Sequence, residues 1–176
     1  MRFFASVASV SLCAVLPATS QNPKPPTGTY EFTLCHPSCG DATTIVGRGV
    51  FVIVEGDIRE LLEGISLRRV PELGSQGEPN ACFWVLADRE IGGREYYPSI
   101  IPVGLTTVTG TGNDFSMRLY ASPDAFFSIV LTFDTAGNVR GQGRQNDWNR
   151  IGPVKFTVMS GRRTGAPDPP SCFKKP

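Results

Sequence analysis

The sequence has little to support histidine chemistry, recognition of a polyanion or anchoring by a long apolar helix. His36 is the only histidine in 176 residues, so a Ser-His-Asp triad is not expected, because a nucleophile needs a base beside it. The formal net charge is +1 at pH 7, and no basic stripe alternates with aromatic residues. We therefore expect no binding to nucleic acid and no electrostatic attachment to anionic lipid.

The apolar run at the N-terminus is too short to span a bilayer. It extends from Phe3 to Leu16 behind a single arginine, whereas a span needs about 20 residues. Pro17 ends the run, and small residues lead up to Ser20. We interpret residues 1–20 as a signal peptide cleaved after Ser20, and we expect a secreted or periplasmic protein with no membrane attachment after cleavage.

Cleavage would remove Cys13 and leave four cysteines: Cys35, Cys39, Cys82 and Cys172. An even number of cysteines in an oxidising compartment favours two disulfides. Three pairings are possible, and the sequence does not choose between them. We favour a Cys35–Cys39 bond that closes a small loop, with a Cys82–Cys172 bond that pins the Pro-rich tail to a strand in the middle of the chain.

The stretch LCHPSCGD, residues 34–41, allows three interpretations: a metal site, a redox site or a structural staple. Zinc needs four ligands at workable spacing, but Cys35 and His36 are adjacent and would point to opposite faces of a strand. Redox sites normally use C-x-x-C, and here one more residue separates the cysteines. We interpret the stretch as a disulfide staple with His36 exposed in a turn, and we expect no metal and no cofactor.

Alternation of apolar and polar residues predicts many short strands. In TYEFTLC, Tyr30, Phe32 and Leu34 share one face, which is typical of a half-buried strand. Pro98 and Pro102 argue against a central strand in the stretch around them. The other segments that we expect to form strands are 44–55, 65–70, 81–86, 114–120, 127–133, 139–145 and 152–163.

We count roughly eight to ten strands, and their spacing predicts an all-β fold. The expected architecture is an antiparallel up-and-down β-barrel, with a β-sandwich as the alternative. Residues 57–64 interrupt the pattern with a capping box, Asp57 followed by Glu60, which predicts one short helix. The expected division of the chain is a signal peptide, a Pro-rich leader, the β-barrel domain and a tail tethered by a disulfide, at residues 1–20, 21–27, 28–163 and 164–176.

Barrel closure would place the first strand beside the last. Tyr30 then lies near Arg162, which we expect on the inner face, where it would cover the tyrosine ring in a cation–π contact. Gly28-Thr29-Tyr30 at the first strand and a basic residue at the last strand resemble the calycin barrels, the lipocalin and avidin group. These carry Gly-x-Trp at the first strand and a basic residue packed across it, and many lipocalins also tie the tail to a strand by a disulfide. The resemblance implies a barrel and no particular ligand.

Six residues are candidate ligand contacts at the barrel mouth: Trp148, Phe127, Gly141, Gly143, Tyr96 and Tyr97. Trp148 stands among polar residues near a strand end, where it can cover the mouth or meet a partner. Gly141 and Gly143 face inward beside the strand of Phe127. There, either Phe rings fill the space over the glycines or a cavity opens.

These features favour a secreted binding module that holds a small, partly apolar ligand in the barrel mouth. The alternative is a protein-interaction or structural domain, such as an inhibitor, that acts through loops at residues 71–80 and 91–104. We expect a monomer in either case, with a small molecule or a protein as its partner.

An enzyme is the third and least favoured interpretation. Two carboxylate pairs could in principle exchange protons: Glu55 with Asp57, and Asp88 with Glu90. Both pairs follow apolar strands, where solvated turns commonly carry acids. We therefore assign no catalytic residue.

Overall fold

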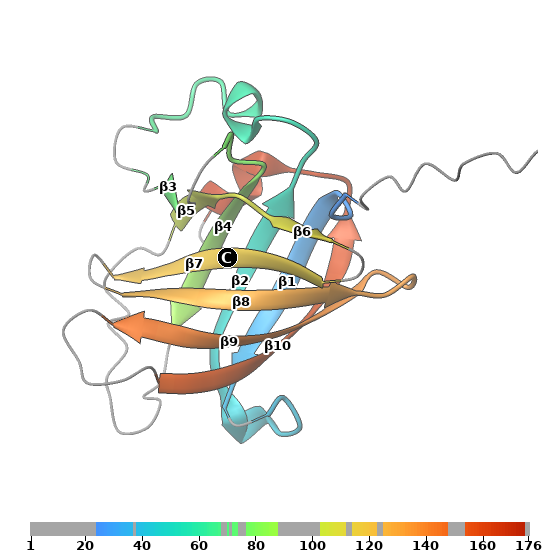
Figure 1. The fold of residues 1–176 in the computed structure, drawn as a ribbon. Helices are drawn as coiled ribbons and strands as arrows, with labels where there is room; N and C mark the ends of the chain where they lie inside the picture. The colour runs from blue at the N-terminus through green and yellow to red at the C-terminus, as the bar shows by residue number, and fades with distance from the viewer. Residues whose placement is uncertain are drawn as a thin grey trace, which may run out of the picture.

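The structure is a computed structural model (Figure 1). It describes residues 24–36, 38–67, 70, 72–73, 77–87, 103–111, 114–122, 125–147 and 154–174. For some strand residues, Phe127 among them, only the backbone is described. Among the described residues, no helix is long and apolar enough to cross a membrane.

The fold is all-β, as the sequence predicts. The described residues form ten strands: β1 (Gly28–Cys35), β2 (Ile45–Ile53), β3 (Glu72–Leu73), β4 (Ala81–Ala87), β5 (Val103–Thr106), β6 (Thr109–Thr111), β7 (Asp114–Ser122), β8 (Ala125–Phe133), β9 (Asn138–Asp147) and β10 (Val154–Gly165). They form one sheet in the order β3-β5-β4-β2-β1-β10-β9-β8-β7-β6. All pairings are antiparallel except the one between β3 and β5.

The first and last strands are antiparallel neighbours, which confirms the predicted seam. The sheet curls into a half-barrel, so that β7, β8 and β9 cross over β1, β2 and β4 (Figure 1). Its two edges are the short strands β3 and β6. Where β5 approaches β7, the backbone N–H of Arg118 donates to the Thr106 hydroxyl at 3.3 Å, a side-chain contact in place of a ladder.

An apolar core fills the space enclosed by the curled sheet. Tyr30 is 1 % exposed and stacks on Phe51, with ring centroids 4.7 Å apart. Phe133 meets the Tyr30 ring edge-on, and the Tyr30 hydroxyl donates to the Pro26 carbonyl at 2.9 Å. The buried members of this inner core are Tyr30, Phe32, Leu34, Val46, Phe51, Ile53, Ala81, Phe83, Val85, Val108, Phe115, Met117, Ile129, Leu131, Val139 and Met159.

Two glycines let the Phe32 ring lie flat across the neighbouring strands. Gly49 of β2 and Gly161 of β10 both pair with Phe32 of β1. A Cβ on Gly49 would lie only 2.5 Å from the Phe32 ring and 2.3 Å from the Trp84 carbonyl oxygen. Close approach of ring and backbone is therefore the reason for glycine at position 49.

A second, outer core covers one end of the opposite face of the sheet. Cys82 and Cys172 are both fully buried there, and the disulfide between them holds the 3₁₀ helix η3 (Pro169–Phe173) against β2 and β4. Its buried members are Val52, Val54, Ile58, Leu62, Cys82, Leu105 and Cys172. The tail adds apolar cover to a sheet face that would otherwise meet water.

The predicted short helix is the 3₁₀ turn η2 (Ile58–Leu61), which Asp57 caps by accepting from the Arg59 N–H at 2.9 Å. The expected strand at 65–70 is wrong for its described residues. Val70 N–H donates to the Leu67 carbonyl at 3.0 Å, which is a turn, and both side chains pack on the outer core. Apolar alternation alone does not separate a strand from turns that cover a core.

Asp134 organises the turn between β8 and β9. Its Oδ1 accepts from the backbone N–H groups of Ala136 at 2.9 Å and Asn138 at 2.8 Å, and its Oδ2 accepts from the Asn138 side chain at 2.8 Å. The Asn138 side chain contributes most to lowering the pKa of Asp134. Gly137 completes the turn at a φ of +84°.

The lowered pKa of Asp134 predicts an acid-sensitive turn. Because the folded pKa lies below the unfolded one, this carboxylate stabilises the fold above the unfolded pKa of about 3.9, and the contribution is lost as pH falls through the folded pKa. We expect Asp134→Asn to reduce the fall in melting temperature between about pH 5 and about pH 2, measured by circular dichroism. Asp168→Asn, at an exposed aspartate without a capping hydrogen bond from its side chain, is the control. Identical pH dependence in wild type and Asp134→Asn would contradict the assignment.

Candidate functional site

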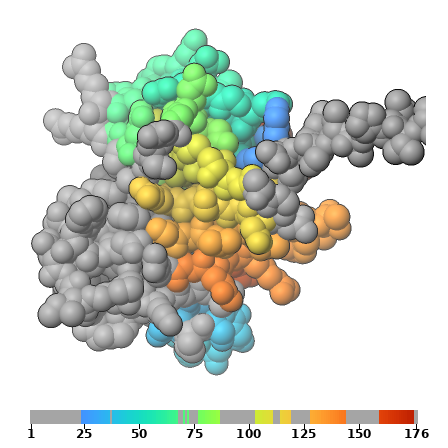
Figure 2. Space-filling view, in the orientation of Figure 1, coloured from blue at the N-terminus to red at the C-terminus, as the bar shows by residue number. Residues whose placement is uncertain are grey.

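An open groove of about 750 Å³ lies on the outer face of β4, β2, β1 and β10. It is on the other side of the sheet from the inner core, next to the part that the outer core covers. Figure 2 shows a different face of the molecule, with β7 and β8 in front. The groove is the part of the outer β1–β2–β4 face that lies beside the outer core.

Cross-strand register assembles the groove from two rows of outward-facing residues. The first row runs across the sheet through Trp84, Val50, Glu31, Arg162 and Asn138. The second row runs parallel to it through Leu86, Arg48, Thr33 and Ser160. Each row therefore has an apolar end on β4 and polar residues on β1 and β10.

The apolar end is formed around Trp84. This residue pairs with Val50, and Leu86 lies on the same outward face of β4 two residues on. Trp84 is only 7 % exposed, yet it lines the groove. Its ring and the neighbouring aliphatic groups offer a flat apolar wall, the kind of surface that holds the apolar part of a small ligand.

The polar end contains two arginines and one acid. Arg48, Arg162 and Glu31 are all exposed and all line the groove. No ion pair within the described residues involves any of the three, although Glu31 and Arg162 are direct cross-strand partners. The two guanidinium groups are free to bind an anion from solution.

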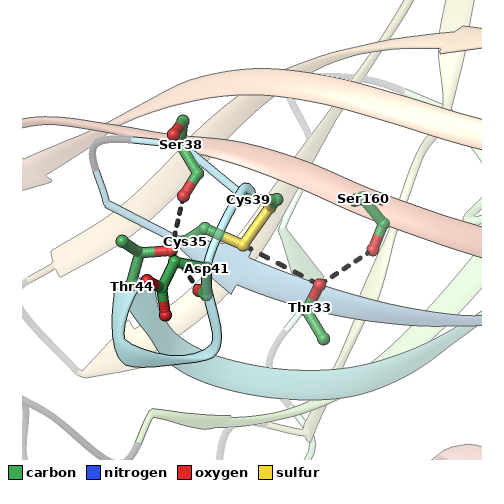
Figure 3. Close-up of a disulfide and its surroundings, with 7 residues drawn as sticks. All are labelled: Thr33, Cys35, Ser38, Cys39, Asp41, Thr44 and Ser160. Carbon is green, nitrogen blue, oxygen red and sulfur yellow. Dashed lines mark hydrogen bonds between the residues drawn. A yellow bond between two sulfur atoms is a disulfide. The ribbon is translucent and has the colours of Figure 1, made fainter.

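The small polar residues between the arginines keep the floor of the groove low. The Thr33 hydroxyl donates to the Ser160 carbonyl at 3.2 Å, which ties β1 to β10 beside the ladder (Figure 3). The Ser160 side chain is exposed. Hydroxyls at these positions supply hydrogen-bond capacity without filling the recess.

The Cys35–Cys39 disulfide stabilises the loop that borders the groove. The bond is present as the sequence favoured, and Cys35 Sγ is 3.8 Å from the Thr33 hydroxyl oxygen (Figure 3). Asp41 caps the 3₁₀ turn η1 (Ala42–Thr44) by accepting from the Thr43 N–H at 2.8 Å, and this hydrogen bond is the main cause of its lowered pKa. The loop leads directly into Ile45, a residue of the groove lining.

His36 differs from its expected exposure, since it is partly buried and its Nδ1 is buried with no hydrogen-bond partner among the described residues. Cys35 and Cys39 are oxidised, so neither is a thiolate ligand. Across the part of the chain that the structure describes, no three His, Cys, Asp or Glu residues are grouped to hold a metal ion. The local staple is the interpretation that the geometry supports.

The inward-facing glycines have no open space over them. A Cβ on Gly141 would lie 2.8 Å from Ile129 Cγ2 and 3.0 Å from Leu131 Cδ2. A Cβ on Gly143 would lie 2.8 Å from Ile129 Cγ1. The space over these positions is filled, but by aliphatic side chains of β8 and not by the expected Phe rings.

Arg162 does not form the expected contact with Tyr30. The two residues are on neighbouring strands, but Arg162 pairs with Glu31 on the outer face, while Tyr30 is buried on the inner face. A register shift between Phe156 and Val158 reverses the alternation of β10, so that Met159 points inward. The residue opposite Tyr30 is Arg163, whose charge partly offsets the effect of burial in raising the pKa of Tyr30.

The other predicted ligand residues are not placed by the structure. Trp148, Tyr96 and Tyr97 are outside the described residues, and for Phe127 only the backbone is described, within β8.

Of the candidate carboxylate pairs, one is described and both of its members are held by cations. Glu55 accepts from Lys24 Nζ at 2.6 Å, and Asp57 forms an ion pair with Arg59 at 2.6 Å. In each case the hydrogen bond from the cation is the largest cause of a lowered pKa. Carboxylates with lowered pKa are poor general acids near neutral pH. Asp88 and Glu90 are outside the described residues.

Sequence reasoning missed the groove residues Glu31, Arg48 and Arg162 as a group. The sequence did indicate which residues point outward, because Glu31 and Thr33 alternate with the apolar residues of their strand. Which outward residues of different strands lie side by side can be inferred only once the strand register is known.

Comparison of the chain with protein-family models, with curated protein sequences and with solved structures finds no significant match.

Proposed function

We propose that the chain is a secreted, disulfide-stabilised β-barrel binding module that takes up a small, partly apolar ligand. The observation that carries the proposal is the outer groove, in which the Trp84 wall faces arginines that have no ion pair. Its volume of about 750 Å³ falls in the range of roughly 300–1,000 Å³ that is typical of small-molecule sites. The two disulfides are compatible with an extracellular location.

The structure changes the location that we favour for the ligand. The barrel mouth was attractive because of the inward glycines, but aliphatic side chains cover Gly141 and Gly143. The outer groove offers both open volume and two chemically different ends. A protein-interaction role would depend on the loops at 71–80 and 91–104, of which the first is described in part and the second falls largely outside the described residues.

Tryptophan fluorescence tests the proposal and its location together. The chain has two tryptophans, Trp84 and Trp148, so Trp148→Phe leaves the groove tryptophan as the only reporter. We expect a panel of small amphipathic molecules to contain members that shift or quench the emission of Trp148→Phe, because the ligand displaces water beside the Trp84 ring. Val130→Ala, at an exposed position of β8 outside the groove, is the matched control and should bind as wild type.

The complementary variant separates the two locations. If Trp84→Phe alone retains the emission change, the ligand lies near Trp148 and the groove assignment is wrong. If neither single-tryptophan protein responds to any member of the panel, and calorimetry also detects no binding, the binding-module proposal is wrong.

A further inference from the structure

We propose that the groove selects organic acids: it binds a monocarboxylate whose anionic group lies between Arg48 and Arg162 and whose apolar part lies on Trp84. The inference rests on the proposed function and specifies its ligand class. It follows from the charge, the spacing and the two-ended shape of the groove.

The first step is the charge of the lining. Among the described residues that line the groove, two arginines face one glutamate, which gives a formal charge of 2 − 1 = +1. Arg59, by contrast, forms ion pairs with Asp57 at 2.6 Å and with Glu72 at 3.6 Å. Among the described residues, Arg48 and Arg162 have no ion-pair partner, so neither guanidinium is neutralised by a direct contact with a carboxylate.

The second step is the spacing of the two arginines. Arg48 pairs with Thr33 on one side of β1, and Arg162 pairs with Glu31 on the other side. Two strand spacings and two residues along the strand separate their Cα atoms by about 12 Å. Arg48 and Arg162 therefore flank β1, and both side chains are long enough to reach a group bound above Thr33. A carboxylate suits this position, because its two oxygens accept from planar guanidinium forks.

The third step is the role of Glu31. It is the direct neighbour of Arg162 and lies diagonally across from Arg48, so it lowers the positive potential that the two arginines create. A single negative charge on the ligand is still attracted, while a second one near Glu31 is repelled. Glu31 therefore restricts the site to monoanions, and its neutralisation should strengthen the binding of a carboxylate.

The fourth step is the apolar end, which distinguishes an organic acid from an inorganic anion. Trp84 and Leu86 of β4 lie beyond Val50 at the far end of the rows from Arg162 and Ser160. A ligand that spans the rows places an acyl chain or a flat ring on this wall. Inorganic phosphate or sulfate would leave the wall hydrated and gain nothing from it.

The test uses matched pairs of probes that differ only in charge: octanoate with octanamide, and indole-3-acetate with indole-3-acetamide. Isothermal titration calorimetry on the mature chain should give at least about tenfold tighter binding for each acid than for its amide. We expect Arg48→Gln and Arg162→Gln each to weaken binding of the acid by about tenfold, with little effect on the amide. Raising the salt concentration from roughly 0.05 M to roughly 0.5 M should weaken the binding of the acid and leave the binding of the amide unchanged.

Two further variants test whether the effect depends on the net charge of the protein and on the sign of the charge that is removed. Arg140→Gln removes an exposed arginine of β9 that pairs with Ser160 but does not line the groove, and it should leave the affinity for the acid within about twofold. Glu31→Gln should raise the affinity for the acid, a gain that a destabilised protein would not show. Unchanged melting temperatures of the arginine variants establish that they are folded.

The outcomes separate this inference from the proposed function. Equal affinity for acid and amide, or equal loss in Arg140→Gln and Arg162→Gln, overturns the selection of carboxylates and leaves a binding groove. Inorganic phosphate that competes with octanoate at equal concentration overturns the role of the Trp84 wall. If no probe binds with a dissociation constant below roughly 1 mM, and no member of the small-molecule panel changes the tryptophan emission, both proposals are overturned.

Discussion

Replacing Phe51 with alanine is expected to lower the free energy of unfolding by about 4 kcal/mol, which is the usual range for a buried phenylalanine. Phe51 is fully buried at the centre of the inner core. Its ring stacks on Tyr30 with an interplanar angle of 9°, and it lies 5.7 Å from the Phe32 ring between centroids. Truncation removes both ring contacts and leaves a cavity that the surrounding strands cannot close.

Chemical denaturation followed by circular dichroism measures this loss. Val130→Ala is the matched control, because Val130 is also in a strand but is 52 % exposed, and it should change stability by less than about 0.5 kcal/mol. Phe51→Leu should recover part of the loss by refilling some of the cavity. Equal stability of Phe51→Ala and Val130→Ala would show that the curled sheet does not enclose a packed core.

Removing the Cys82–Cys172 bond should cost more than removing the Cys35–Cys39 bond. The first bond closes a separation of 90 residues and the second a separation of 4. In the chain-entropy model these loops correspond to about 4.5 and about 2 kcal/mol. The larger effect is reinforced by packing, since Cys82 and Cys172 are both fully buried in the outer core.

The measurement compares the double variants Cys82→Ala/Cys172→Ala and Cys35→Ala/Cys39→Ala with wild type under oxidising conditions. We expect the first to unfold at clearly lower denaturant concentration and to expose the tail to proteolysis. We expect the second to remain folded but to loosen the loop beside Ile45. A larger loss of stability in the Cys35→Ala/Cys39→Ala protein would contradict the view that the tail disulfide is the main staple.

The local pattern of the chain was sufficient for most strands. The meander from β7 to β10 follows the alternation in residues 114–163, and the seam between β1 and β10 follows from barrel closure. The strands β5 and β6 were not expected, because the short segments 103–106 and 109–111 carry too few alternating residues. The strand expected at 65–70 is a turn that packs its apolar residues on the outer core.

Predicted contacts failed where the register is irregular. The expectation that Arg162 covers Tyr30 counted alternate residues from Val154 along β10. The irregularity between Phe156 and Val158 shifts that count by one, so Arg162 points outward and Arg163 lies opposite Tyr30. A bulge in one strand depends on its partners, and a sequence pattern within the strand does not reveal it.

The sequence by itself determined the class of the fold, the seam between its first and last strands, and the number of disulfides that four cysteines can form. These properties depend on alternation, on chain order and on composition, all of which are present in the linear chain. Only the tertiary structure decided which part of the sheet stays open. The outer core and the disulfide-held tail cover one end of the β2–β4 outer face, and the register sets Trp84, Arg48 and Arg162 around the end that remains. A groove built from single residues of separate strands exists only once the pairing of those strands is fixed.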